Sequence, residues 1–306
     1  MPKNNSEIRK SYIFDKYAVI APNRAKRPHD IDKRIDTKNE CVFCLENLKK
    51  RKILKTIKAA KNNSVIAIKN EFPAVTENNA KAYGKQEVII ESLKHNQQMA
   101  DMPVTQIIGI LKMYAARSQA IAKDKKIKYI LCLKNQGKAA GASLVHPHSQ
   151  IFATAIIPPE LQEESEKIKE YFKTNKRCAY CDIIKKEAKS SRRVYADKNM
   201  LAFAPYASQF PYEIWIFSQR HTDNITRLKP AELKSLAVML KKACQKLKKI
   251  NLPFNYFLHN SINDKHQHFY VKIQPRRDVW AGVELGSGLT IDSVAPEKAA
   301  KYYRQK

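Results

Sequence analysis

The same order of cysteine pairs, histidines and predicted elements occurs twice along this chain of 306 residues. Each half opens on a Cys-x-x-Cys pair and continues through two short β-branched segments, with a histidine after the second. A long helix-like segment follows, and each half ends on a His-x-His. An order of elements that recurs within one chain is typical of an internal duplication. We therefore expect two copies of one α+β unit that together form a single compact body.

Runs rich in β-branched and aromatic residues, bounded by turn residues, predict the strands of each unit. They cover 64–69, 87–91, 127–134 and 149–156 in the first half, and 199–204, 212–218, 255–260 and 269–274 in the second. Each half also has one long helix-like segment, 99–122 or 230–249. A Pro-Pro pair at Pro158 opens a charged, helix-like connection that reaches Lys176. We place the boundary there, which divides the chain into halves 1–157 and 158–306.

The two Cys-x-x-Cys pairs favour metal binding over disulfides. A structural zinc ion takes four cysteine or histidine ligands in a tetrahedron, and two thiolates from one tight turn supply half of them. A single pair is also consistent with a redox dithiol or with two unrelated core cysteines, but the duplication favours metal. The symmetry of the halves selects the histidines. The expected sites are Cys41, Cys44, His95 and His146 in the first half and Cys178, Cys181, His221 and His266 in the second, with His29 and His259 as competing histidines.

The segment His146-Pro147-His148-Ser149-Gln150 predicts a nucleophile for phosphate chemistry. Transfer of a nucleotidyl group through a covalent intermediate needs a group that is neutral near pH 7 and leaves easily, and imidazole has both properties. Pro147 stiffens the link between the predicted zinc ligand His146 and the predicted nucleophile His148. We expect a backbone carbonyl of this turn to accept a hydrogen bond from Nδ1 of His148, so that Nε2 attacks phosphorus. Gln150 is then expected to donate to the phosphoryl oxygens.

A small, polar loop precedes this segment and runs from Asn135 through Gly137 and Gly141 to Ser143, in a chain with only 7 glycines. Glycines let backbone N–H groups approach a phosphate closely. Taken alone, such a loop is more often a plain turn between strands. Its position just before a His-Pro-His favours a phosphate-binding loop.

The run from Asn135 to Gln150 resembles the active-site segment of galactose-1-phosphate uridylyltransferases, the branch of the histidine-triad (HIT) superfamily with two fused repeats. The resemblance is colinear and covers nearly the whole chain. It includes 23–28, similar to that family's early phosphate-contacting segment, and 70–73, similar to its nucleoside-contacting segment. It also includes the zinc ligands expected in the first half. The resemblance implies two fused HIT-like repeats, each an antiparallel sheet with a long helix.

By this resemblance, His148 attacks the α-phosphate of a nucleoside diphosphate sugar, releases the sugar 1-phosphate, and passes the nucleotidyl group to a second sugar phosphate. The family is dimeric, so the resemblance also implies a homodimer in which Arg24 and Arg27 act across the subunit interface. The matching nucleotide- and phosphate-binding positions are Arg24, Arg27, Asn70, Glu71, Phe72, Asn135, Gly141, Ser143 and Gln150.

Departures from the family pattern bear on the substrate. Ser149 stands where the galactose enzymes usually have glycine, and the C-terminal segment keeps only Gly282 and Glu284 of the hexose-contacting pattern. Together with the second Cys-x-x-Cys, these features are more similar to relatives that act on ADP-sugars, some by phosphorolysis. A UDP-glucose:hexose-1-phosphate uridylyltransferase of galactose metabolism is the first prediction, and an ADP-sugar phosphorylase or adenylyltransferase is the second. His268 matches the nucleophile's position in the second half without the glycine-rich loop, and we expect it to be structural.

The composition adds a third possibility, a non-enzymatic zinc protein that binds nucleic acid. The formal charge is +28, from 57 Lys+Arg against 29 Asp+Glu, and such a charge attracts nucleic acid, anionic membranes or phosphorylated small molecules. The lysines are spread along the chain without a stripe of interleaved aromatic residues, which favours composition bias, so no nucleic-acid partner is expected. Charges interrupt every apolar stretch and the N-terminus lacks a signal-peptide pattern. We therefore expect no membrane partner and a cytoplasmic location.

Overall fold

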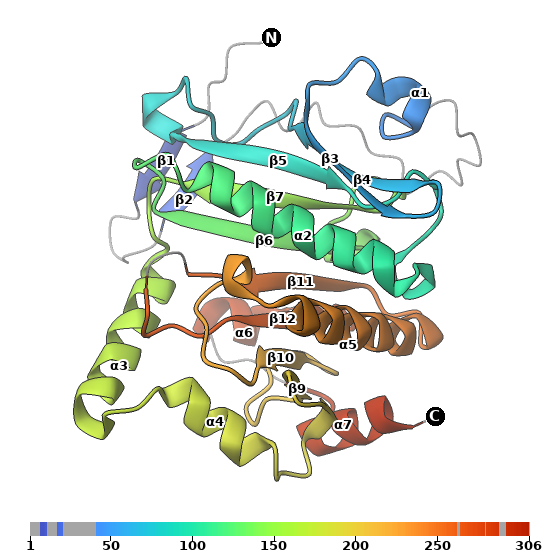
Figure 1. Cartoon of the computed structure of the whole chain (residues 1–306). Coiled ribbons are helices and arrows are strands. Elements are labelled where there is room, and N and C mark those ends of the chain that lie inside the picture. Colours follow the sequence, from blue (N-terminus) through green and yellow to red (C-terminus); the bar gives the residue numbers. More distant parts are fainter. Residues whose placement is uncertain are drawn as a thin grey trace.

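A computed structural model describes residues 7–10, 17–20, 41–261, 264–278, 280–287 and 292–305. Ten strands of this part form one antiparallel sheet in the order β3-β4-β5-β7-β6-β11-β12-β10-β9-β8 (Figure 1). The first half supplies β3 (Ile53–Ala60), β4 (Asn63–Lys69), β5 (Gly84–Ile90), β6 (Tyr129–Gln136) and β7 (His148–Thr154). The second half supplies β8 (Arg193–Ala196), β9 (Met200–Phe203), β10 (Ile214–Ser218), β11 (Phe254–His259) and β12 (Tyr270–Pro275). A separate ribbon pairs β1 (Glu7–Lys10) with β2 (Tyr17–Ile20).

The two halves meet edge to edge through β6 and β11, which pair from Phe254 with Gln136 to Phe257 with Leu133. The predicted fold of two α+β repeats, each an antiparallel sheet with a long helix, is confirmed. The two repeats also share one continuous sheet, so the centre of the molecule is a strand pair that spans the duplication. Residues far apart in the sequence are thereby held in register across the joint.

The long helix of each half, α2 (Val104–Ile121) and α5 (Pro230–Lys249), lies on the same face of the sheet (Figure 1). The start of α5 follows from local chemistry. Pro230 occupies the first turn, where its missing N–H costs nothing, and the Glu232 carboxylate accepts a hydrogen bond from the backbone N–H of Lys229 at 2.6 Å. The remaining helices are α1 (Leu45–Leu48), α3 (Pro159–Asn175), α4 (Ala179–Glu187), α6 (Gly282–Ser287) and α7 (Pro296–Arg304).

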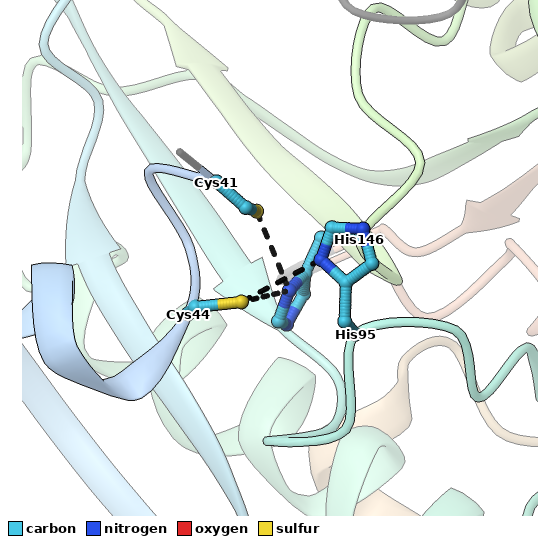
Figure 2. Close-up of side chains that lie close together, drawn as sticks. All are labelled: Cys41, Cys44, His95 and His146. Carbon is cyan, nitrogen blue, oxygen red and sulfur yellow. Dashed lines mark hydrogen bonds between the residues drawn. The ribbon is translucent and has the colours of Figure 1, made fainter. Parts of the chain in front are cut away.

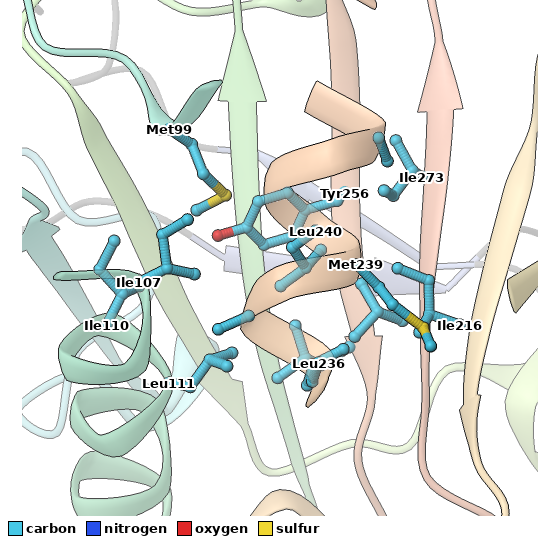
Figure 3. Packing of buried hydrophobic residues seen from close by; sticks show 14 of the residues in the cluster. Met99, Ile107, Ile110, Leu111, Ile216, Leu236, Met239, Leu240, Tyr256 and Ile273 are labelled. Atoms are coloured by element: carbon cyan, nitrogen blue, oxygen red, sulfur yellow. The ribbon is translucent and has the colours of Figure 1, made fainter. Parts of the chain in front are cut away.

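The main core lies between the sheet and the two long helices. Ile107 and Ile110 of α2 and Leu236 and Leu240 of α5 are fully buried there (Figure 3). The sheet contributes the side chains at alternate strand positions, as the two-residue period of a strand requires. Burial of this apolar surface is the main stabilising contribution to such a fold. The opposite face of the sheet is thus left for the functional groups.

Two smaller buried clusters lie on that opposite face, and each contains one Cys-x-x-Cys pair. The first gathers around β4, β5 and the turn before α1, and the second gathers around β9, β10, β12 and α4. Among the helices of the described part, none is long and apolar enough to cross a bilayer.

Candidate active site and metal centres

The first predicted ligand set is brought together as one buried cluster (Figure 2). Cys41 and Cys44 come from the tight turn before α1, which is closed by a bond from the Cys44 N–H to the Cys41 carbonyl at 3.1 Å. His95 comes from the loop after β5, and His146 lies two residues before β7. All four ligand atoms lie within 4.8 Å of one another.

The spacing of these atoms fits a tetrahedral ion. Zn–S and Zn–N bonds of about 2.3 and 2.05 Å at a tetrahedral angle place sulfur and nitrogen about 3.6 Å apart. The observed distances from Nδ1 of His146 are 3.6 Å to Cys41 Sγ and 3.8 Å to Cys44 Sγ, and Nδ1 of His95 lies 3.5 Å from Cys44 Sγ. The set of two thiols and two imidazoles is also a donor set that zinc prefers.

The protonation of His146 suits this arrangement. Burial lowers the pKa of His146 to about 4, because the charged ring loses its hydration. The neutral ring uses Nε2–H to donate to the backbone oxygen of Ser92 at 2.8 Å, which leaves Nδ1 as the lone-pair nitrogen that faces the sulfurs. A backbone acceptor of this kind fixes the tautomer of a metal-ligating histidine.

A second cluster of the same composition forms in the other half from Cys178, Cys181, His221 and His268. Nδ1 of His221 lies 3.5 Å from Cys181 Sγ, and Nδ1 of His268 lies 3.8 Å from the same sulfur. Nε2 of His268 lies 2.7 Å from the backbone oxygen of Ser218, as that of His146 does from Ser92. This cluster is less enclosed than the first, because His221 is exposed and Cys181 is only partly buried.

The prediction of His266 as the fourth ligand is therefore wrong, and His268 takes that place. The ring of His266 lies against Phe172 instead, with ring centroids 4.7 Å apart. The reason is the position at which each strand begins. Strand β7 begins at His148, and its cluster histidine, His146, lies two residues earlier. Strand β12 begins at Tyr270, so the residue two positions earlier is His268. His268 is accordingly the counterpart of the metal-cluster histidine, and Tyr270 stands where His148 stands in the first half. The prediction that His268 matches the nucleophile's position is therefore also wrong, because Tyr270 occupies that position.

His148 is the first residue of β7 and is 7% exposed. Its Nδ1 lies 2.8 Å from the backbone oxygen of His146, which matches the hydrogen bond expected for this turn. With the proton on Nδ1, the lone pair lies on Nε2. The ring of Phe43 packs on His148 at a centroid distance of 5.3 Å and an angle of 57°. One turn thus holds a metal-cluster ligand and an oriented imidazole two residues apart.

Gln150 follows His148 on the same face of β7, since side chains alternate along a strand. Its Oε1 accepts a hydrogen bond from Gln86 Nε2 at 3.1 Å, and Gln86 Oε1 in turn accepts from the Ala74 N–H at 2.8 Å. This relay occupies the acceptor of Gln150 and keeps its amide nitrogen as the remaining donor. Ser149 between them is turned to the other face and is 1% exposed. Ser149, which stands where the galactose enzymes usually have glycine, therefore lines neither cavity at His148.

Two adjoining cavities meet at His148 and share Leu144. One extends over β4 and β5, and the other extends over the glycine-containing loop. The backbone turn at Asn70 is fixed by its own side chain, whose Oδ1 accepts from the Phe72 N–H at 2.9 Å, and Glu71 pairs with Arg51. The first cavity is lined by Val42, Phe43, Arg51, Ile68, Lys69, Asn70, Glu71, Phe72, Val88, Ser143, Leu144, His148 and Gln150. The second is lined by Gln98, Lys134, Asn135, Gln136, Gly137, Ala142, Leu144, Val145, His146, Pro147 and His148.

The loop between β6 and β7 needs its glycines. Gly137 and Gly141 have φ angles of 86° and 79°, a region that residues with a Cβ rarely adopt. The second half holds this loop in place: Asn255 Nδ2 donates to Asn135 Oδ1 at 2.8 Å and to the Ala140 backbone oxygen at 2.7 Å. The predicted phosphate loop is therefore fixed by a residue from the other repeat.

Some predicted residues do not join this site in the described part of the chain. Gly282 and Glu284 lie on α6, and neither lines the two cavities at His148. Arg24 and Arg27 lie outside the described residues, as does the competing His29. His259 is partly buried and stacks on Tyr270, with ring centroids 3.9 Å apart, and it belongs to neither cluster. Sequence reasoning missed Phe43, Gln86 and Asn255, because each acts through a partner distant in the sequence.

Comparison with known proteins agrees with this geometry. The family model "Galactose-1-phosphate uridyl transferase, N-terminal domain" matches residues 2–158, and the "HIT domain" model matches 185–272. The chain is 30% identical to an ADP-glucose phosphorylase of Arabidopsis thaliana over 98% of this chain and 92% of that protein. It is 28% identical to a galactose-1-phosphate uridylyltransferase of Thermotoga maritima over 98% of each.

Solved structures give the same result for the fold. The crystal structure of the Arabidopsis thaliana ADP-glucose phosphorylase with bound ADP-glucose superposes with a TM-score of 0.80, at 30% identity and over 99% of both chains. A uridylyltransferase structure superposes with a TM-score of 0.81, at 27% identity and over 97% of both chains. The chain therefore belongs to the galactose-1-phosphate uridylyltransferase family and is an enzyme of the nucleotidyltransferase type.

Proposed function

We propose that the protein transfers a nucleotidyl group from a nucleoside diphosphate sugar to a phosphate acceptor through a covalent intermediate on His148. The observation that carries this proposal is the orientation of the His148 ring. Nδ1 lies 2.8 Å from the His146 carbonyl oxygen, so that with the proton on Nδ1 the lone pair of the ring lies on Nε2, and His148 lines both cavities.

In the first step, Nε2 of His148 attacks the α-phosphorus. A P–N bond forms, the bond from phosphorus to the bridging oxygen breaks, and the sugar 1-phosphate leaves with that electron pair. Gln150 donates its amide N–H to a phosphoryl oxygen as charge builds up there. The backbone N–H groups around Gly141, with Asn135 and Ser143, hold the phosphates, and the turn at Asn70 to Phe72 holds the nucleoside.

In the second step, an oxygen of the acceptor phosphate attacks the same phosphorus. The P–N bond breaks and the electron pair returns to Nε2, which restores neutral His148. Because each step inverts the configuration at phosphorus, the two steps together retain it. The reaction is a ping-pong double displacement, and the acceptor alone decides whether it is a transfer or a phosphorolysis.

Both cysteine–histidine clusters fit zinc by donor set and by spacing, and we propose one zinc ion in each. In the first cluster, Cys41, Cys44, His95 and His146 would hold the ion. A bound zinc would supply rigidity to the turn next to His148, which is a structural role. In the second, Cys178, Cys181, His221 and His268 would hold α4 against β12.

The first candidate for the reaction is UDP-glucose:hexose-1-phosphate uridylyl transfer, with Gly282 and Glu284 in the sugar site and Arg24 and Arg27 at the phosphates of a homodimer. The second is ADP-sugar phosphorolysis. It is supported by the 30% identity to a phosphorylase of ADP-glucose over nearly the full length. We also propose a boundary between the repeats at 157/158.

One assay distinguishes the candidates. The protein is incubated with UDP-glucose or ADP-glucose, together with galactose 1-phosphate or inorganic phosphate, and glucose 1-phosphate is measured. Uridylyl transfer predicts product from UDP-glucose with galactose 1-phosphate, and phosphorolysis predicts product from ADP-glucose with phosphate. Without an acceptor, the accepted donor releases about one glucose 1-phosphate per chain and leaves the nucleotidyl group on His148. Inactivity of the zinc-loaded protein with every pair contradicts the proposed function.

A further inference from the structure

A fully buried ion pair contacts the backbone of His148. Lys134 Nζ is 2.6 Å from Glu91 Oε2, and the two side chains are 1% and 0% exposed. Lys134 Nζ also donates to the backbone oxygen of His148 at 3.1 Å. Lys134 lies on β6 and Glu91 directly follows β5, so the pair comes from the two neighbours of β7, the strand that His148 opens (Figure 1).

These contacts complete the hydrogen bonding of the His-Pro-His backbone. The His146 oxygen binds Nδ1 of His148, the Pro147 oxygen accepts from the Glu91 N–H at 3.0 Å, and the His148 oxygen accepts from Lys134. Each of the three consecutive carbonyls is therefore held, two of them by the ion pair residues. The peptide planes on both sides of the imidazole are fixed, and the direction of its Cα–Cβ bond is fixed with them.

Stability alone does not account for the pair. A buried ion pair loses the hydration of both charges, and apolar residues of similar size are often at least as stabilising. Among the described residues, Glu91 Oε1 has no hydrogen-bond partner, which adds to that cost. In some proteins buried charged or polar groups are retained for the single conformation that they specify rather than for stability.

The second repeat shows that the fold does not need it. The strand registers of the two repeats show which positions are equivalent. Leu258 is equivalent to Lys134 and Ser218 to Glu91, and Tyr270 is equivalent to His148. The same sheet is therefore built there without buried charge. The ion pair occurs in the repeat that carries the imidazole.

We propose that Lys134 and Glu91 are positioning residues that hold Nε2 of His148 in line with the reacting phosphorus. This inference rests on the proposed role of His148. Neither residue lines the cavity over β4 and β5, and Lys134 borders the second cavity with a side chain that is only 1% exposed and is held by Glu91. We therefore expect the pair to act mainly on the rate of nucleotidyl transfer and little on substrate binding. A displacement of a catalytic group by about 1 Å costs on the order of 100-fold in rate.

The test compares Lys134→Met with the double variant Glu91→Leu/Lys134→Met, which removes both charges at nearly constant volume. Both are expected to lower kcat about 10- to 100-fold and to change KM for the nucleotide sugar less than about threefold. The melting temperature is expected to fall in the single variant, which leaves an unpaired buried carboxylate, and to recover in the double variant. A low kcat in a stable protein separates positioning from stability.

Arg192→Met is the matched control. Arg192 forms a largely enclosed ion pair with Glu187 at 2.7 Å, with side chains 11% and 5% exposed, in the second repeat and away from His148. Its loss is expected to lower the melting temperature and leave kcat unchanged. If the apolar pair fails to fold, Glu91→Ser/Lys134→Leu repeats the comparison with the residues that the second repeat already carries.

Different results would contradict the nucleophilic role of His148 and the positioning role of Lys134 and Glu91. Wild-type kcat in the folded double variant overturns the positioning role and leaves the function of His148 intact. A wild-type protein that never releases sugar 1-phosphate overturns the function and the positioning role with it. A loss of kcat in Arg192→Met equal to that in the double variant also overturns positioning, because the rate would then follow stability alone.

Discussion

His146 and His148 are two residues apart, and the backbone oxygen of the first holds the ring of the second by a bond of 2.8 Å to Nδ1. We expect His148→Ala to lose at least about 10⁴-fold in kcat, since the nucleophile of a covalent mechanism has no substitute. His148→Gly leaves a space for free imidazole, which should restore part of the release of sugar 1-phosphate. Mass spectrometry of the wild type with donor alone should show one added nucleoside monophosphate. A His148→Ala variant that still acquires this mass contradicts the assignment.

The correction from His266 to His268 predicts a difference in metal content. Elemental analysis of the purified protein should return two zinc ions per chain, one for each cluster. His268→Ala should reduce this to about one, because three ligands bind zinc more weakly and this cluster is partly open. His266→Ala is the matched control and should retain both ions. Loss of zinc from His266→Ala alone would restore the original sequence interpretation.

Asn255 connects the second repeat to the phosphate loop of the first. Asn255→Ala removes the donor to Asn135 and to the Ala140 carbonyl, so the loop loses two hydrogen bonds. We expect KM for the nucleotide sugar to rise about 10-fold, in line with about 1 to 3 kcal/mol for buried groups left unpaired. Asn175→Ala at the end of α3 is the control for loss of an asparagine and should leave KM unchanged. Equal KM values in both variants would mean that the loop holds its own shape.

The stacked ring of His259 predicts a contribution to acid sensitivity. Burial, with a smaller effect of Lys272, lowers the pKa of His259 well below 6.5, and Nε2 has no hydrogen-bond partner among the described residues. The unfolded chain therefore binds a proton in a pH range where the folded chain does not. The stability that neutral His259 contributes is complete above about pH 6.5 and is lost as the pH falls toward the lowered pKa.

His259→Phe keeps the stack on Tyr270 and removes the titrating group. Chemical denaturation at pH 7 and pH 5 should show a smaller loss of unfolding free energy in the variant than in the wild type. Metal loss in acid affects both proteins alike, so the comparison isolates His259. An identical loss in both proteins would show that His259 stays neutral in the unfolded chain or is protonated in the folded one.

Much of the fold was predictable from local patterns. Helix α5 has the predicted bounds, because Pro230 and a capping glutamate mark its start, and eight of the strands lie within a few residues of their predicted ranges. Strand β3 was not predicted, because it is an edge strand whose lysines interrupt the apolar alternation. Short β8, also an edge strand, was missed in the same way.

The site divides along similar lines. The cysteine pair, His146 and His148 were predictable because they stand in tight motifs, and His95 was predictable because the order of elements recurs in the second half. His266 was chosen over His268 because a His-x-His offers two histidines, and only the register of β12 decides between them. The pairing of Glu91 with Lys134 was not predictable, since a lysine in a chain of high positive charge is expected on the surface. Its burial depends on contacts made across 43 residues.

The pairing of β6 with β11 makes the stability of each repeat depend on the other. The two repeats have no free strand edge at their junction, because β6 and β11 pair there. Separating the two repeats near Pro158 would leave one edge of β6 and one edge of β11 with unpaired backbone N–H and C=O groups. Such edges tend to pair with strands of other chains and to aggregate. The repeats are therefore expected to unfold in one transition, and a lesion in the half without His148 is expected to disable the half that carries it.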